Sequence, residues 1–259
     1  MKILRSRDNP LLKQLIRLSG SSRERRASGI TILDGEHLIE AYCAAGIGPL
    51  ELLAASEKGI ERAAIARIME TAPANSRVLI EDRLLSQISQ VVTTTGVLAL
   101  IKTPLKPELP ARIGDGIFLE CVQDPGNMGS ILRSALGAGI RQVFISRTSV
   151  FTWSPKVVRA AMGAHFRLEL HENVELNDLR ERATGPLIAT LPRVDETIHT
   201  ADLRGPCIWM FGNEGAGLSE EAVAAADLLV SIPLSDSTES LNVAAAAAVC
   251  LFEQRRQRH

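Results

Sequence analysis

Residues 120–139, ECVQDPGNMGSILRSALGAG, join the end of an apolar stretch to a tight turn and then to a helix-forming run. The apolar residues 117–122 predict a buried strand, and Asp-Pro-Gly at 124–126 predicts a turn. We expect the helix to begin near Ser130. A strand that leads through a short turn into a helix is the building unit of α/β proteins, so this segment indicates an α/β fold.

The same alternation continues on both sides of this unit. Strands are expected over Ile117–Val122, Gln142–Ser146, Leu187–Leu191, Cys207–Phe211 and Leu228–Ile232. Helices are expected over Ser130–Leu136, Pro155–Met162, Glu175–Ala183, Leu218–Ala225 and Ser240–Gln257. The pattern predicts a mostly parallel sheet with helices on both faces. Ligands of such sheets bind beyond the carboxyl ends of the strands, so the loops there are the candidate functional positions.

A proline-rich stretch divides the chain. Residues 102–116, KTPLKPELPARIGDG, contain three prolines and two glycines, which favour an extended linker over 104–114. We therefore expect one domain over 1–103 and a second over 115–259. In the first domain the pattern predicts a basic helix over 1–18, strands over 30–34, 50–56, 77–81 and 97–102, and helices over 36–45, 60–72 and 82–91, the last capped by Asp82.

Basic residues gather at the start of a chain whose net charge is only −1. Residues 1–26 hold eight Lys and Arg against Asp8 and Glu24, a pattern that suits a phosphate backbone. A solvated amphipathic helix is the alternative interpretation. The scarcity of aromatic residues, 3%, argues against broad base-stacking platforms. The candidate RNA-binding residues are Arg5, Lys13, Arg17, Arg23, Arg25 and Arg26.

The positions of the cysteines, histidines and apolar residues argue against a metal-binding, a disulfide-rich or a membrane protein. Four separated cysteines form no CxxC pair, so neither zinc spacing nor a disulfide framework is visible. The five histidines show no metal-ligand spacing, and we expect no metal site. The chain has neither an apolar leader nor an apolar run of about 18 residues, so we expect a cytoplasmic protein with no membrane span.

Three segments carry polar residues after strands, and we name them by their order. In the first signature segment (120–139) Asn127 is expected in the turn and Arg133 in the first helical turn, where free N–H groups favour anions or hydroxyls. The second (207–227) places three glycines around Asn213 and Glu214, with neither the Walker nor the dinucleotide spacing.

The third signature segment (230–254) leads from a strand through a polar loop into an alanine-rich helix. Ser240 is expected at the helix start, where it could serve as a cap, and Asn242 lies inside the first turn. Taken singly, each of the three segments is also compatible with an ordinary structural turn.

Together, the three segments resemble the signature motifs of the SpoU family, the TrmH-like branch of the SPOUT superfamily of RNA ribose 2′-O-methyltransferases. Asp-Pro-Gly-Asn-x-Gly with Arg133 is similar to the first motif, Phe211 through Gly217 to the second, and Ile232-Pro233 with 240–243 to the third. Their order and separations agree with the family. The N-terminal part, from NPLLKQLIRL to ILDGEHLIEA, resembles an L7Ae-like RNA-binding domain more weakly.

The resemblance implies a knotted α/β domain (a trefoil knot), a homodimer and bound S-adenosylmethionine. It implies catalytic roles for Asn127, Arg133, Glu214, Ser240 and Asn242, and cofactor contacts for Thr190, Leu191, Gly212, Ile232 and Leu241. Structured RNA is the implied substrate, with ribosomal RNA favoured over transfer RNA. The alternatives are a non-catalytic RNA-binding or assembly protein, which would not bind the cofactor, and a generic nucleotide-binding α/β enzyme.

Overall fold

The computed structural model describes residues 3–89 and 95–259, which form two compact units. The first unit contains the chain up to residue 105 together with 151–166, and the second contains 106–150 and 167–259. The sequence assigned 151–166 to the second domain, whereas the structure groups this segment with the first. The first residues of the helix expected over 1–18, and the last of the helix expected over 82–91, lie outside the described residues.

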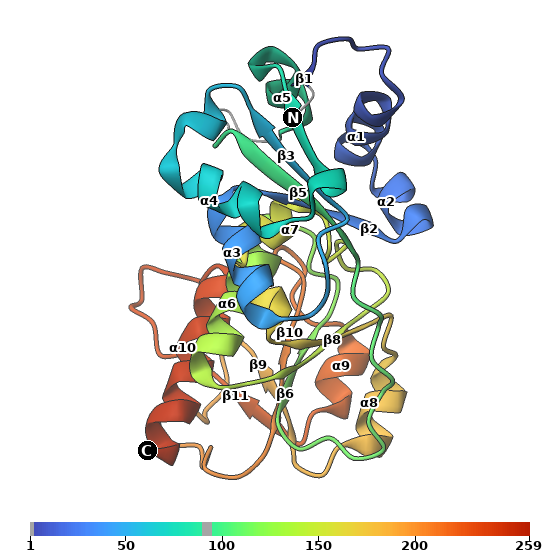
Figure 1. The fold of residues 1–259 in the computed structure, drawn as a ribbon. Helices are drawn as coiled ribbons and strands as arrows, with labels where there is room; N and C mark the ends of the chain where they lie inside the picture. Colours follow the sequence, from blue (N-terminus) through green and yellow to red (C-terminus); the bar gives the residue numbers. More distant parts are fainter. Residues whose placement is uncertain (1–2, 90–94) are drawn as a thin grey trace. The chain divides into compact units, whose positions relative to one another are not determined.

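The first unit is a mixed five-stranded sheet in the order β1-β4-β3-β5-β2 (Figure 1). Strands β1, β3 and β4 run parallel, and β5 pairs antiparallel with β2 and β3. Leucines of α1 and α5 cover one face, and α3 and α4 pack on the other. The elements are β1 (Ile3–Leu4), α1 (Pro10–Gly20), α2 (Ser22–Ser28), β2 (Ile30–Asp34), α3 (Glu36–Ala45), β3 (Leu52–Ser56), α4 (Ala63–Thr71), β4 (Arg77–Ile80), α5 (Asp82–Ile88), β5 (Val97–Lys102) and α7 (Pro155–Ala160).

The start of the chain differs from the basic helix expected over 1–18. Residues 3–4 pair with β4 as a strand, and the first helix begins at Pro10. The reason is local: the residue before a proline is driven out of the helical region, and the Asn9 side chain accepts the Leu11 N–H as a cap. Asp82 also differs from expectation, because it is the first residue of α5 and its carboxylate accepts the Lys58 N–H instead of capping the helix.

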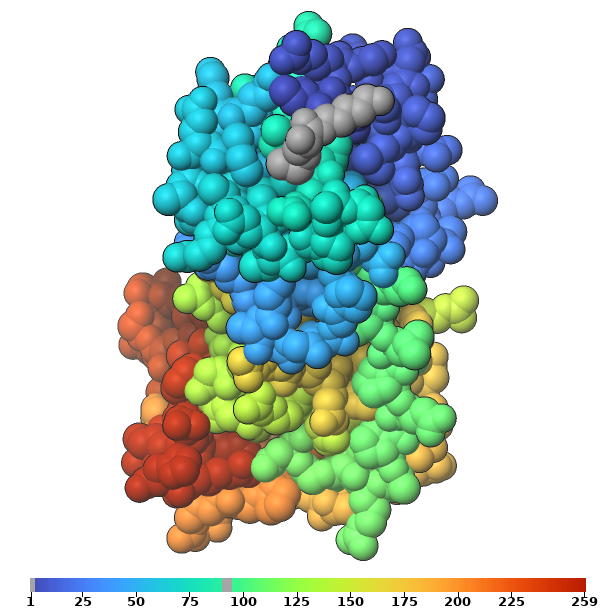
Figure 2. All heavy atoms as spheres, in the orientation of Figure 1, coloured from blue at the N-terminus to red at the C-terminus, as the bar shows by residue number. Residues whose placement is uncertain are grey.

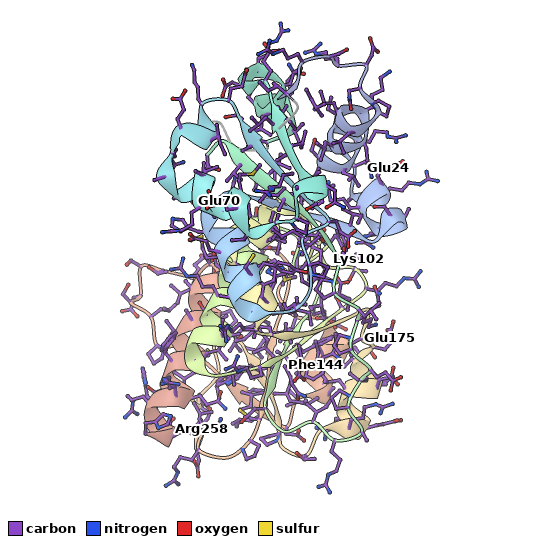
Figure 3. All side chains as sticks on the ribbon, viewed as in Figure 1. Glu24, Glu70, Lys102, Phe144, Glu175 and Arg258 are labelled. Carbon is purple, nitrogen blue, oxygen red and sulfur yellow. The ribbon has the colours of Figure 1, made fainter. Side chains whose placement is uncertain are left out.

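The second unit is a parallel six-stranded sheet in the order β11-β9-β10-β6-β7-β8. Helices α6 and α10 pack together on one face, while residues of α8 and α9 join the core of the other (Figure 1). That core includes Phe144, labelled in Figure 3. The elements are β6 (Gly116–Leu119), α6 (Pro125–Ala138), β7 (Gln142–Ile145), β8 (Glu169–Glu172), α8 (Leu176–Arg182), β9 (Leu187–Thr190), β10 (Ile208–Phe211), α9 (Glu220–Ala225), β11 (Leu228–Val230) and α10 (Val243–Arg258).

The expected parallel α/β architecture is therefore confirmed, with three local corrections. Strand β8 was not anticipated, because its sequence Glu-Leu-His-Glu offers one aliphatic side chain in four residues. Helix α6 begins at Pro125 rather than near Ser130, since Pro suits the first helical position and Asp124 caps it. Helix α10 begins at Val243, and its cap is Asn242 rather than Ser240.

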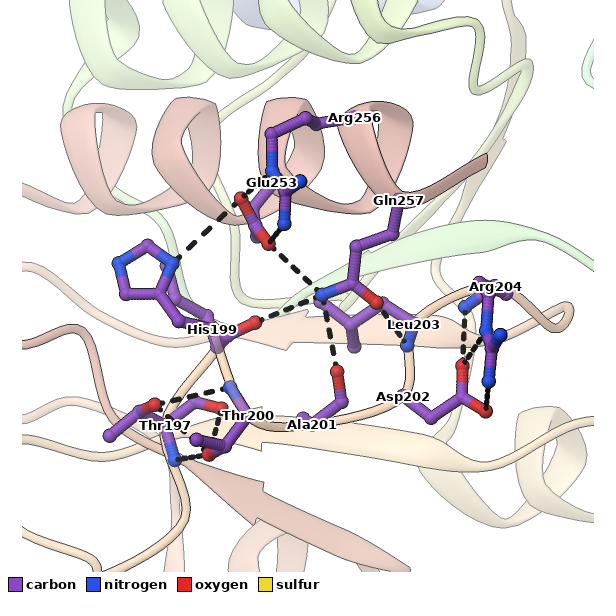
Figure 4. Close-up of polar contacts among 11 residues, drawn as sticks. Thr197, His199, Thr200, Ala201, Asp202, Leu203, Arg204, Glu253, Arg256 and Gln257 are labelled. Atoms are coloured by element: carbon purple, nitrogen blue, oxygen red, sulfur yellow. Dashed lines mark hydrogen bonds and ion pairs between the residues drawn. The ribbon is translucent and has the colours of Figure 1, made fainter. Parts of the chain in front are cut away.

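Polar contacts fix α10 to the rest of the second unit. The buried Trp209 indole N–H donates to Gln254 at 3.0 Å, and Arg258, labelled in Figure 3, forms a double 2.8 Å ion pair with Asp115. Figure 4 shows Glu253 and Gln257 of the same helix holding the 197–203 segment. Hydrogen bonds from the Arg256 guanidinium and from the Gln257 side chain lower the pKa of Glu253 to about 2. Among the described residues, no helix has the length and apolar character needed to cross a bilayer.

Candidate active site

The three signature segments meet at the carboxyl ends of the central strands of the second unit. The first segment follows β6, the second follows β10, and the third follows β11. Strands β6, β10 and β9 are direct neighbours in the sheet, and β11 lies beside β9. Because all four run parallel, their carboxyl ends share one edge, which is where ligands of such sheets bind.

The Glu214 carboxylate ties the second segment to the first. It accepts the backbone N–H of Asp124 at 2.8 Å, the backbone N–H of Gln123 at 3.1 Å and the Asn127 side-chain amide at 3.1 Å. Partial burial raises the pKa of Glu214, but these hydrogen bonds together outweigh it and hold the pKa below its ordinary value. The group is therefore an anion at neutral pH.

Asn127 extends this connection to the third segment. Its side-chain oxygen accepts the Asn242 amide at 2.9 Å, while the Asn242 oxygen caps α10 by accepting the N–H groups of Ala244 and Ala245. The corrected helix start is what permits this link, because Asn127 projects from the first turn of α6 rather than from a loop. Glu214, Asn127 and Asn242 thus form one hydrogen-bonded chain that crosses all three segments, and we call it the Glu-Asn-Asn chain.

The loop after β10 is folded tightly on itself. The Asn213 oxygen accepts the N–H groups of Gly215 and Ala216, and its amide donates to the Cys121 carbonyl at 2.9 Å. The backbone of residue 213 also exchanges two hydrogen bonds with Gly217. A Cβ on Gly212 would lie 2.2 Å from the Gly217 carbonyl carbon and oxygen, so only glycine fits there.

A cavity of about 590 Å³ opens beside this loop. Its wall is mostly aliphatic side chains and exposed backbone from the ends of β9, β10 and β11 and from the start of α10. All five residues expected to contact a cofactor line it, and so do two of the expected catalytic residues; these are Thr190, Leu191, Gly212, Ile232, Leu241, Glu214 and Ser240. The volume suits a nucleoside-sized ligand.

Three of the expected catalytic residues do not line the cavity themselves. Two of them are connected by hydrogen bonds to a residue that does, and the third, Arg133, is not. Asn127 and Asn242 join the cavity wall by way of Glu214. Arg133 is exposed on α6, six positions after Asn127, and forms no hydrogen bond or ion pair with the described part of the chain. The structure therefore gathers the expected catalytic set except for Arg133, whose guanidinium is free to meet a ligand.

The six candidate RNA-binding residues of the first unit do not share one environment. Arg25 is only 5% exposed and donates to the Leu18 and Ser19 carbonyls, so it holds α1 against α2 and is not available to a phosphate. This corrects the sequence assignment, which could not distinguish a buried arginine from a surface one. The other five side chains are exposed; Arg5 and Lys13 form surface ion pairs, and Arg26 lies over the Phe151 ring.

Sequence reasoning missed three polar residues near the cavity. Glu120, at the end of β6, accepts both the N–H and the hydroxyl of Ser219 and so fixes the end of the loop after β10. Arg193 and Glu239 line the cavity itself. Arg193 lies in the loop after β9, beyond Leu191 and Pro192, so the rule that located the signature segments would have located it too. Within residues 3–89 and 95–259, no cluster of three or more His, Cys, Asp or Glu could hold a metal ion.

Comparison with known proteins gives a consistent result. The family model described as the SpoU rRNA Methylase family matches residues 116–252. An uncharacterised tRNA/rRNA methyltransferase of Synechocystis sp. is 33% identical, over 97% of this chain and 93% of its own.

Two crystal structures are similar over nearly the whole chain. One, of an RNA 2′-O ribose methyltransferase, has a TM-score of 0.85 at 29% identity and covers 99% of both chains. The other, of the SpoU methyltransferase AviRb from Streptomyces viridochromogenes with the cofactor AdoMet, has a TM-score of 0.86 at 26% identity, covering 96% of this chain and 98% of that one. With the hydrogen-bonded signature segments at one sheet edge, these matches establish that the chain belongs to the SpoU rRNA methylase family.

Proposed function

We propose that this chain transfers a methyl group from S-adenosylmethionine to the 2′-hydroxyl of a ribose in structured RNA. The observation that carries the proposal is the Glu-Asn-Asn chain, which joins three distant segments beside a nucleoside-sized cavity. A protein that only bound RNA would have no need for this arrangement. Family membership and the AdoMet-bound crystal structure of a relative support the same reaction.

The cavity fits the cofactor. Gly212 lines the cavity with backbone atoms alone, since it has no side chain. A Cβ at this position would occupy space already filled by Gly217. Leu191, Ile232 and Leu241 supply apolar contact for a flat adenine, and backbone groups can read its edge. When bound, S-adenosylmethionine supplies an electrophilic methyl group on a positively charged sulfur. The Glu214 carboxylate on the cavity wall is the matching negative charge.

Catalysis by this site depends mainly on positioning. The Glu-Asn-Asn chain holds the three segments in one geometry, so the ribose oxygen can be presented in line with the methyl group. Arg133 is exposed and unpaired within the described residues, which suits a guanidinium that grips the neighbouring phosphate and stabilises negative charge on the oxygen. Arginine stays protonated and cannot accept the hydroxyl proton, which would pass to a water molecule as the oxygen takes the methyl group.

Ribosomal RNA is the proposed substrate class, in preference to transfer RNA. The family description supports this choice, and the first unit, proposed here as an L7Ae-like domain, offers the exposed cations Arg5, Lys13, Arg17, Arg23 and Arg26 for the phosphate backbone. Labelled methyl donor incubated with total RNA should label ribosomal RNA, and the modified nucleotide should be found where alkaline cleavage fails. Label in transfer RNA alone would refute the choice of substrate.

The experiment that tests the reaction itself is calorimetry with S-adenosylmethionine followed by the labelling assay. The proposed enzyme binds the cofactor and labels RNA at the 2′-oxygen. A non-catalytic assembly protein would retain RNA without binding the cofactor. A nucleotide-binding enzyme of another class would be stabilised by a different nucleotide in a thermal-shift screen.

We also propose a cytoplasmic homodimer whose contact includes α10. Figure 2 shows part of α10, in red, at the surface, and this helix exposes Val249 and Phe252 at 40% and 48%. Val249 and Phe252 lie about one helical turn apart, so together they offer an apolar surface to a second copy of the chain. Phe252→Glu should halve the mass measured by light scattering, whereas Phe252→Leu should leave it unchanged. A wild-type monomer would refute the dimer.

The knot implied by the family is proposed for the second unit. The Thr197–Ser231 bridge holds the 191–207 connection against the chain that leaves β11, and that chain must then pass β9 and β10 to reach α10 beside α6. Such a route supports a threaded backbone, which ordinary topology rules exclude. An experimental structure whose backbone traces without a crossing through the 191–207 loop would refute it.

A further inference from the structure

The cavity carries two charged side chains to which no role has been assigned. Of the nineteen residues that line it, three are charged: Glu214, which belongs to the Glu-Asn-Asn chain, and Arg193 and Glu239. Arg193 enters from the loop after β9, and Glu239 from the loop before α10. One cation and one further anion therefore face a cavity that is otherwise lined by neutral groups.

Neither charge is compensated within the described part of the molecule. Arg193 and Glu239 form no ion pair with each other or with another described residue, whereas many other arginines of this chain do, such as Arg180 with Asp227. Their charged atoms therefore lie more than 4 Å apart, and both side chains are exposed where they line the cavity, so a ligand that bears both charges can reach them from inside it. A side chain that bridges to a bound group of opposite charge contributes a charge-assisted hydrogen bond, which is about twice as strong as a neutral one.

We propose that Arg193 binds the carboxylate, and Glu239 the ammonium group, of the amino-acid end of the methyl donor. The inference rests on the proposed function and deepens it. An α-amino acid is a zwitterion, and it is the one part of S-adenosylmethionine that carries two opposite charges beside each other. The adenosine end requires no charged partner, and it is matched by the apolar wall near Leu191, Ile232 and Leu241.

Comparing two ligands without a charge on sulfur measures the contribution of the amino-acid end to binding. S-adenosylhomocysteine and 5′-methylthioadenosine are both uncharged at sulfur and differ mainly in whether the amino acid is present. In calorimetry, Arg193→Gln should weaken S-adenosylhomocysteine binding about tenfold, the loss expected for one partly solvated charge-assisted hydrogen bond. The same variant should change 5′-methylthioadenosine binding less than twofold. Arg193→Lys keeps the charge and should recover most of the affinity.

Decarboxylated S-adenosylmethionine separates the two residues. It retains the ammonium group and lacks the carboxylate, so its affinity should be unaffected by Arg193→Gln and should fall several-fold with Glu239→Gln. Arg112→Gln, which removes an exposed arginine outside the cavity, is the matched control and should leave all ligands unchanged. Thermal unfolding of each variant without ligand confirms that the fold is intact.

Two outcomes would overturn the inference. Equal weakening of both neutral ligands by Arg193→Gln would mean that the residue acts on the cavity as a whole. Unchanged S-adenosylhomocysteine affinity with a raised KM for RNA would assign Arg193 to an RNA phosphate instead. If the wild-type protein bound neither the donor nor its product, the proposed function would fail, and that result is distinct from an insensitive variant of a protein that binds both.

Discussion

Gly212→Ala should abolish cofactor binding while leaving most of the protein folded. The new Cβ would lie 2.2 Å from the Gly217 backbone, whereas ordinary contact begins at 3.4 Å, so the loop has to retreat by about 1.2 Å. Shifts of about 1 Å in positioning groups cost on the order of 100-fold in rate, and overpacking costs about 1–3 kcal/mol of stability. We therefore expect at least a 100-fold fall in kcat/KM together with a large loss of S-adenosylhomocysteine affinity.

Gly215→Ala is the matched control in the same loop. Its Cβ would meet only the Asn213 side-chain oxygen, at 3.6 Å, and its φ is not in the left-handed region. Calorimetry measures affinity for S-adenosylhomocysteine, labelled-methyl incorporation into RNA measures turnover, and thermal unfolding measures stability. If Gly212→Ala bound the product and turned over within threefold of Gly215→Ala, the close backbone approach would not be what shapes the cavity.

Three further predictions concern other parts of the site and its support. Arg133→Lys should lose most activity while keeping cofactor affinity, and near-normal turnover would remove Arg133 from the mechanism. Glu214→Gln should lower kcat/KM more than tenfold, because one acceptor oxygen becomes an N–H donor facing N–H donors. Since the folded-state pKa of Glu214 is depressed, its carboxylate contributes to stability above about pH 4.3, and this contribution is lost as pH falls further. The difference in unfolding free energy between wild type and Glu214→Gln should therefore shrink in acid, and a difference that stays the same from neutral to acid pH would contradict this account. Gln254→Leu should destabilise the protein by about 1–3 kcal/mol in urea titration, because the buried Trp209 N–H loses its acceptor. Gln14→Leu, at an exposed position, is the control, and a difference between the two variants below about 0.5 kcal/mol would mean that the Trp209 hydrogen bond contributes little to stability.

Local patterns in the sequence predict most of the strands and helices and the residue types of the site. Strands such as β6 and β10 are short apolar runs that end in turn residues, and this periodicity is local, so it can be read without neighbours. The same holds for the three signature segments, whose spacing along the chain is fixed by covalent order. Asn127, Glu214 and Asn242 were therefore identified before any contact between them was known.

How those residues come into contact depends on the order of the strands in the folded sheet. Asn127 and Glu214 are 87 positions apart, and Asn127 and Asn242 are 115 apart, so their hydrogen bonds depend on the strand order β11-β9-β10-β6. No local pattern encodes that order, because it follows from how whole sheets and helices pack. The early start of α6 and the capping role of Asn242 have a local cause instead, because each depends on one side chain that accepts N–H groups two or three residues further along the chain.

Burial and close approach were also decided only in three dimensions. Arg25 and Arg23 look alike in the sequence, yet one is enclosed by the carbonyls at the end of α1 and the other is exposed. Gly212 looks like any loop glycine until Gly217 is found against it. A linear sequence records which groups are available, but whether a charge meets solvent, a carbonyl or a ligand depends on atoms brought in from distant parts of the chain by packing.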